Sequence, residues 1–177
     1  MHLINNRVRL IILMLPATIL LYNMPLKAQF SENHIGVRGG MYGGIYYQNI
    51  VPAGMAETSF FAMISANKES VRATVLKLTY ETSLSEIADN LFFVWGYGGH
   101  AGFAVTDHTY FLGRRYQFEY SRFRPLLGVD GWAGLEYRFI TVPLSIGLNL
   151  KPYMELMFPG FVNIVPGDIG LSVAYTF

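Results

Sequence analysis

The chain has 177 residues, a formal net charge of +1 and no cysteine, and 52% of its residues are hydrophobic. The absence of cysteine excludes disulfides, thiolate metal sites and a lipid-modified cysteine. The near-neutral charge argues against general nucleic-acid binding, which requires a basic surface. After the N-terminal segment no apolar run approaches the roughly 20 residues of a transmembrane helix, so we expect no helical membrane span.

The N-terminal segment is typical of a secretory signal peptide. Two arginines precede an apolar run at Leu10–Tyr22, whose 13 residues are too few for a helical span and are interrupted by Pro16. Ala28 is a small residue of the kind found at cleavage sites. We therefore predict a signal peptide at 1–29 and one mature domain at 30–177, and we disfavour an uncleaved anchor. The mature domain has ten basic and twelve acidic residues, and thus a net charge of about −2.

Alternation of apolar with polar or small residues predicts strands along the mature chain. The first three expected strands lie at residues 35–48, 56–66 and 71–82. In the first strand Arg38 shares the inner face with glycines. In the third strand we assign Lys77 and Glu81 to the inner face and the apolar residues between them to the outer face.

Further strands are expected at residues 91–105, 126–139 and 143–156. In the first of these, Trp95 and Tyr97 lie on the face opposite His100. The clearest alternation is at Asp168–Phe177, where every second residue from Ile169 onward is apolar. A last strand that ends on an aromatic residue is typical of outer-membrane barrels. In such barrels the last strand closes the sheet and its terminal aromatic residue is recognised by the barrel-assembly machinery. We therefore expect Tyr175 and Phe177 to form the assembly signal.

These segments number seven, whereas bacterial barrels of this kind have an even number of strands. We place the missing strand at 109–121, where the alternation is weak. The alternative is that 104–124 forms one long surface loop and that another segment divides into two strands. With the missing strand at 109–121, the short turns expected at 67–69 and 140–142 both lie at the periplasmic end of the barrel. The sequence thus predicts an all-β protein, a transmembrane antiparallel up-and-down β-barrel of eight strands.

The interior of an eight-stranded barrel is just wide enough for side chains to fill it. Charges enclosed there must be paired or hydrogen-bonded, because an unpaired buried charge is costly. The near balance of signs on the inward face predicts a lumenal ion-pair network instead of an open pore. The predicted network consists of Arg38, Lys77, Glu81, His100, Asp130, Glu136, Arg138, Asn149, Lys151 and Asp168.

Several stretches resemble a family of small, mostly uncharacterised outer-membrane β-barrel proteins. Leu127–Phe139 has the pattern GxDGxxGLEYxF, Val142–Tyr153 has VPxxxxLxxKP, and the chain ends on Tyr-Thr-Phe. Trp95–Phe103 is similar to the aromatic-glycine strand of that family. The resemblance covers roughly half of the mature chain. It implies an outer-membrane location and a closed barrel similar to the outer membrane protein A and X type, and it implies no settled activity.

His100 is the sharpest candidate for catalysis, because some small outer-membrane barrels modify lipid A with a histidine general base. In the deacylases among them the histidine is paired with a serine two residues on, and position 102 here is glycine. A lumenal hydrogen-bonding role is therefore favoured. Asp107, His108 and Glu119 match no metal template, and the glycines of the fourth strand open no helix that could bind phosphate. We expect no catalytic residue, no cofactor and no metal ion.

Four arginines are interleaved with aromatic residues between positions 104 and 124. Arginine suits bidentate contact with phosphate, so this segment is a candidate contact for lipopolysaccharide or another external ligand. The equally weighted alternative is an aromatic girdle with snorkelling arginines. The four residues are Arg114, Arg115, Arg122 and Arg124.

Together these features predict an integral outer-membrane β-barrel protein without enzymatic activity, which acts in envelope integrity or in surface and ligand interaction. Its expected partners are outer-membrane lipid, lipopolysaccharide and the barrel-assembly machinery, and no nucleic acid. The alternatives are a narrow channel for small or apolar solutes and a lipid A-modifying enzyme. A soluble periplasmic barrel of lipocalin type would place its apolar face inside, and alternation alone does not distinguish the two faces.

Overall fold

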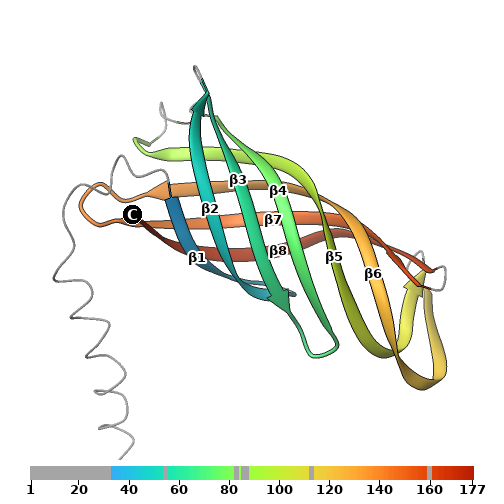
Figure 1. Cartoon of the computed structure of the whole chain (residues 1–177). Helices are drawn as coiled ribbons and strands as arrows, with labels where there is room; N and C mark the ends of the chain where they lie inside the picture. Colours follow the sequence, from blue (N-terminus) through green and yellow to red (C-terminus); the bar gives the residue numbers. More distant parts are fainter. Residues whose placement is uncertain (1–32, 54–55, 82–83, 85–87, 112–113, 159–160) are drawn as a thin grey trace, which may run out of the picture.

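The computed structural model describes residues 33–53, 56–81, 84, 88–111, 114–158 and 161–177 (Figure 1). The predicted signal peptide at 1–29 lies outside the described residues. Within the described ranges the chain contains no helix with the length and apolarity of a membrane span. The strands are β1 (Asn33–Gly39), β2 (Gly43–Ala53), β3 (Ala56–Ala66), β4 (Ser70–Glu81), β5 (Leu91–Phe111), β6 (Arg114–Arg138), β7 (Leu144–Met157) and β8 (Phe161–Thr176).

Each strand pairs antiparallel with the next, and β1 also pairs with β8, so the sheet forms a closed barrel of eight strands. Ile35 lies opposite Tyr175, and Val37 lies opposite Val173, at the seam. The predicted all-β, eight-stranded antiparallel up-and-down topology is therefore confirmed. The alternation expected for the last strand is also confirmed, since Ile169 is 67% exposed and Asp168 is fully buried.

The two ends of the barrel are distinguished by their connections. At the termini end, the N–H of Thr176 donates to the carbonyl of Pro143 at 2.9 Å, and that of Phe177 donates to Asn33 at 3.0 Å. The far end carries the β5–β6 hairpin (Figure 1) and the β3–β4 turn, whose Glu69 carbonyl accepts from Val105 at 2.7 Å. The prediction that turns 67–69 and 140–142 share one end is thus wrong.

The eighth strand arises from the first expected segment. Residues 35–48 do not form one strand, because the glycine-rich stretch after Arg38 reverses the chain and pairs Arg38 with Gly44. The segment 109–121 instead belongs to the ends of β5 and β6, where Val105 pairs with Phe123 and Thr109 with Tyr116. The alternative of a long surface loop at 104–124 is wrong as well. Its second part, that another expected segment forms two strands, is correct for 35–48.

The face of β4 is opposite to the prediction. Leu76, Leu78 and Tyr80 are buried inside the barrel, whereas Lys77 and Glu81 are exposed on its outside. The expected lumenal positions of Lys77 and Glu81 are therefore wrong. The physical reason is that the interior contains an apolar layer, so an apolar residue on an alternating strand has a favourable place on either face.

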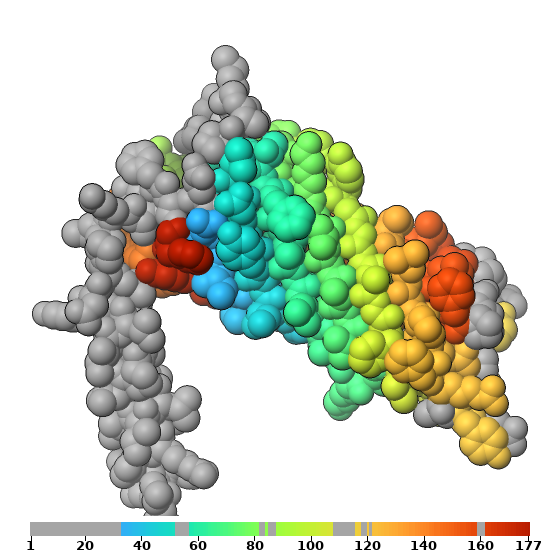
Figure 2. All heavy atoms as spheres, in the orientation of Figure 1, coloured from blue at the N-terminus to red at the C-terminus, as the bar shows by residue number. Residues whose placement is uncertain are grey.

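Every strand of the barrel exposes large hydrophobic side chains on its outer face. Figure 2 shows one side of this outer surface. Many large hydrophobic side chains of the described wall have 47% or more of their surface exposed. Examples taken around the barrel are Ile35, Ile45, Ile64, Val75, Tyr97, Val129, Leu148 and Ile169. The polar side chains of the described wall face mainly inward. The exceptions include Lys77, Glu81, Gln117, Arg122 and several threonines.

Glycine allows a large side chain to lie flat against the wall at Gly170. A Cβ atom there would lie 2.6 Å from Cζ of Arg38 and 2.7 Å from the carbonyl oxygen of Gly39. We expect Gly170→Ala to lower the free energy of unfolding by about 1–3 kcal/mol through overpacking. The measurement is urea unfolding of the folded barrel, followed by tryptophan fluorescence.

The matched control is Gly39→Ala on the neighbouring strand, because a Cβ atom at Gly39 would meet nothing within 4 Å. We expect this variant to unfold at nearly the urea concentration of the unsubstituted protein. Equal stability of the two alanine variants would contradict the proposed close approach at Gly170.

Candidate functional site

Five charged side chains meet inside the barrel toward its far end, and we call them the charged cluster. Its members are Arg72, His100, Asp130, Lys151 and Glu155, all of which are buried. Nη2 of Arg72 donates to both carboxylate oxygens of Glu155, at 3.0 and 2.7 Å. Nζ of Lys151 lies 2.6 Å from Oδ1 of Asp130. The cluster thus joins β4, β5, β6 and β7 across the interior.

His100 bridges the two carboxylates of the cluster. Its Nδ1 lies 2.7 Å from Oδ2 of Asp130, and its Nε2 lies 3.3 Å from Oε2 of Glu155. A carboxylate oxygen only accepts hydrogen bonds, so both ring nitrogens find their partners when the imidazole is doubly protonated. In that state the cluster has three cations and two carboxylates, which leaves one positive charge in excess.

A second polar group surrounds Arg38 of β1. Its Nη1 donates to Oδ2 of Asp168 at 2.8 Å, its Nη2 to the Asp168 carbonyl at 2.8 Å, and its Nε to Oδ1 of Asn149 at 2.7 Å. The other oxygen of Asp168 accepts from the N–H of Met41 at 2.9 Å. This network therefore fastens the β1–β2 turn to β7 and β8.

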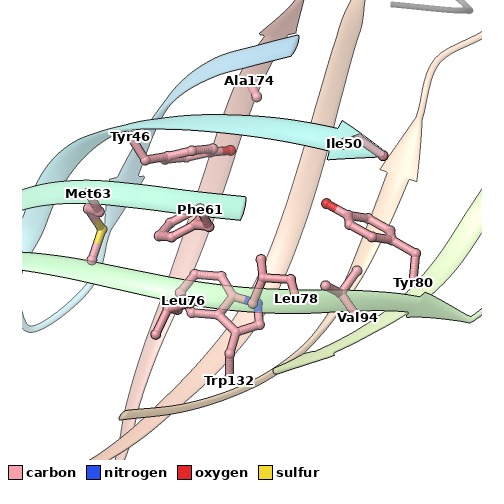
Figure 3. Packing of buried hydrophobic residues seen from close by; sticks show 10 residues of the cluster. All are labelled: Tyr46, Ile50, Phe61, Met63, Leu76, Leu78, Tyr80, Val94, Trp132 and Ala174. Atoms are coloured by element: carbon pink, nitrogen blue, oxygen red, sulfur yellow. The ribbon is translucent and has the colours of Figure 1, made fainter. Parts of the chain in front are cut away.

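Apolar side chains fill the middle of the barrel, and we call them the apolar plug (Figure 3). Phe61 stacks on Tyr46 with ring centroids 4.9 Å apart and lies 5.2 Å from the ring of Trp132. A small pocket of about 20 Å³, close to the space of one water molecule, lies beside these rings and is also lined by Gln48, Glu136 and Asn149. The plug consists of Tyr46, Ile50, Phe61, Met63, Leu76, Leu78, Tyr80, Val94, Trp132 and Ala174.

A third polar group lies between the plug and the termini end. Arg138 donates to Glu57 at 2.9 Å and to Glu136 at 3.1 Å, and its guanidinium lies over the rings of Tyr80 and Phe92. The hydroxyl of Tyr80 donates to Glu136 at 3.1 Å and is also hydrogen-bonded to Gln48. Charged groups on both sides of the plug are thus compensated by close partners.

A pocket of about 490 Å³ lies at the far end, above the charged cluster, and we call it the mouth pocket. Arg72 and Glu155 of the cluster form part of its lining. Its other lining residues are Met41, Tyr42, Asn67, Glu69, Ser70, Ala104, Thr106, Tyr153, Met157, Asn163, Ile164, Val165 and Pro166. The pocket therefore combines a buried charged floor with partly apolar walls.

The structure places eight of the ten predicted network residues inside the barrel, in these three groups. They are Arg38, His100, Asp130, Glu136, Arg138, Asn149, Lys151 and Asp168. Lys77 and Glu81 are not among them, and the Glu81 carboxylate accepts from Nε1 of Trp95 on the outside at 2.9 Å.

The four arginines of the predicted lipopolysaccharide contact do not form one surface. Arg122 is exposed, but Arg124 is 5% exposed and points into the barrel, so its assignment to an outer contact is wrong. The side chains of Arg114 and Arg115 lie outside the described residues, as do those of His108 and Glu119. The described residues contain no group of three or more metal-ligating side chains.

Sequence reasoning missed Arg72 and Glu155. Glu155 has the same parity as Lys151 on one strand, so the inward face of that strand already indicated it. Arg72 has the parity of Leu76 and Leu78, and the reversed assignment of β4 placed it outside. At the C-terminus, the rings of Tyr175 and Phe177 stack 6.2 Å apart on the outer surface.

Comparisons of the chain with protein-family models, with curated proteins and with solved structures found no match.

The charged cluster predicts a large effect of removing one carboxylate. Asp130→Asn leaves Lys151 and His100 without their closest anion, and we expect a loss of about 3–5 kcal/mol in unfolding free energy. Asp89→Asn in the exposed turn before β5 is the control and is expected to change stability by less than about 0.5 kcal/mol. Urea unfolding measures both, and equal effects would contradict the ion-pair role.

Proposed function

We propose that the protein is an integral outer-membrane β-barrel with a sealed interior, which acts in envelope integrity or in interactions at the surface. The observation that carries this proposal is the apolar outer surface on all eight strands of a closed barrel. Soluble monomers rarely expose apolar patches larger than a few hundred Å². A barrel that is apolar outside and charged inside suits a lipid solvent.

Closure and strand length support the same proposal. In hydrocarbon every backbone N–H and C=O group needs a partner within the protein, and a closed barrel provides one. A tilted strand needs about 9–11 residues to cross a bilayer. Seven of the eight strands have 11 residues or more, and β1 with seven residues is the exception.

Aromatic side chains gather at both ends of the outer surface, as in the girdles of membrane barrels. At the termini end, Tyr137 packs on Phe139, and Tyr175 on Phe177. At the far end, Phe103 stacks on Phe123 with ring centroids 5.3 Å apart. Lys77, Glu81 and Arg122 are exposed charged residues of the described wall, and the long apolar stem of Lys77 allows its amine to reach toward a polar boundary.

The interior favours a structural or binding role over a channel. Between the mouth pocket and the polar group of Arg138, the side chains of the apolar plug fill the middle of the barrel. Enzymatic modification of lipid A is also disfavoured. Both ring nitrogens of His100 face carboxylates, so the ring is not paired with a hydroxyl nucleophile.

The first test is the heat-modifiability of the mature barrel in lipid vesicles, by gel electrophoresis with and without boiling. We expect a mobility shift on boiling, and we expect Leu148→Arg on the outer face to cost about 2–4 kcal/mol of folding in the bilayer. Leu148→Phe keeps an apolar side chain at the same outward position and controls for general damage to β7. A soluble, unshifted protein that tolerates Leu148→Arg would contradict the proposal.

A second test addresses the sealed interior. We expect the folded protein to produce no unitary conductance above the bilayer background, because packed apolar side chains occupy the middle of the barrel. Planar-bilayer recordings measure this, with a porin of known conductance as the positive control for insertion. Reproducible unitary currents would establish the channel alternative instead.

A further inference from the structure

We propose that the mouth pocket binds a small monocarboxylate with an apolar chain, whose carboxylate is held by Arg72. This inference goes beyond membrane insertion and does not depend on it, since the pocket lies inside the barrel.

Arg72 forms part of the floor of the mouth pocket, and not all of its hydrogen-bond donors have a partner. Its side chain is 3% exposed, and Nη2 is occupied by the two oxygens of Glu155. Nε and Nη1 are buried and have no hydrogen-bond partner among the described residues. Buried guanidinium donors are normally satisfied, so two open donors on a residue of the pocket lining indicate an acceptor that reaches the guanidinium after a local shift of the lining.

The orientation of the guanidinium is held by its neighbours. Its Cζ lies 3.8 Å from the ring centroid of Tyr42 and 5.0 Å from that of Tyr153, and both rings also line the pocket. Stacking and the bond to Glu155 restrict the rotamers of Arg72 before any ligand arrives. A preorganised donor loses little entropy on binding, which favours affinity.

The charge of the floor sets the charge of the ligand. Glu155 accepts from Arg72, His100 and Asn163, so its oxygens are already occupied. With His100 doubly protonated the charged cluster has one positive charge in excess, which matches one carboxylate. Glu69 at the rim carries a negative charge and accepts from Thr106 at 2.8 Å, so a second negative charge on the ligand is disfavoured.

The walls of the mouth pocket determine the polarity and the size of the rest of the ligand. Met41, Ala104, Met157, Ile164 and Val165 supply apolar surface above the charged floor. A volume of about 490 Å³ is within the range of small-molecule sites, which runs from roughly 300 to 1,000 Å³. An apolar chain of several carbons fits this space, whereas a folded macromolecule does not.

The test is calorimetric titration of the folded mature barrel in non-ionic detergent with hexanoate, 1-hexanol and hexylamine, after subtraction of micelle blanks. We expect saturable binding of hexanoate, tighter than that of either analogue by about tenfold, as for one charge-assisted contact. Absence of saturable hexanoate binding, or equal binding of hexanoate and hexanol, would overturn the proposal.

Two variants locate the site. Arg72→Gln is expected to weaken hexanoate by about tenfold and to abolish its advantage over hexanol. Ala104→Phe fills the pocket and keeps Arg72, so it is expected to weaken all binding. Ala101→Phe, on the outer face of the same strand, is the control and should bind as the unsubstituted protein does.

If Arg72→Gln does not fold, the proposal is still tested by comparing Ala104→Phe with Ala101→Phe. Both place a phenylalanine on β5, the first on the inner face and the second on the outer face. Undiminished binding in folded Ala104→Phe would overturn the proposal. A protein that binds hexanoate but fails the heat-modifiability test would contradict membrane insertion and leave the pocket assignment standing.

Discussion

The pairing of β1 with β8 is the constraint on which the rest of the structure depends. Closure removes the sheet edges and encloses a space only wide enough for side chains. Every inward charge must then find a partner on another inward face, because water and counterions have little access. The pairs Arg38–Asp168 and Arg72–Glu155 join strands far apart in the sequence for this reason.

Enclosure also explains the positions of the small residues. Arg38 lies against Gly170, and the ring of His100 lies against Gly128, so that a Cβ atom at either glycine would collide with the larger group. Large and small inward residues are therefore complementary across neighbouring strands. This complementarity lets two buried cations approach the carboxylates that neutralise them.

Along the barrel axis, the interior consists of a polar layer, an apolar layer and a charged layer, and this order bears on function. The apolar plug separates the polar group of Arg138 from the charged cluster and the mouth pocket. A filled middle agrees with the proposed absence of conduction, and an open far end agrees with the proposed ligand site. The apolar outer surface supports the proposal of a lipid environment independently of both.

The sequence by itself determined the all-β class and the inward face of most of β5–β8, because period-two alternation survives wherever one face is apolar. The count of eight came from the even number of strands in bacterial barrels, and the extra strand was placed in the wrong segment. It identified His100, Asp130 and Lys151, but not their meeting with Arg72 and Glu155. Only the tertiary structure decided the face of β4, the hairpin at Arg38–Gly44 and the inward turn of Arg124. The physical reason is that the plug makes the interior apolar at one level and charged at others. The favoured face of an alternating strand therefore depends on what the other strands place opposite it.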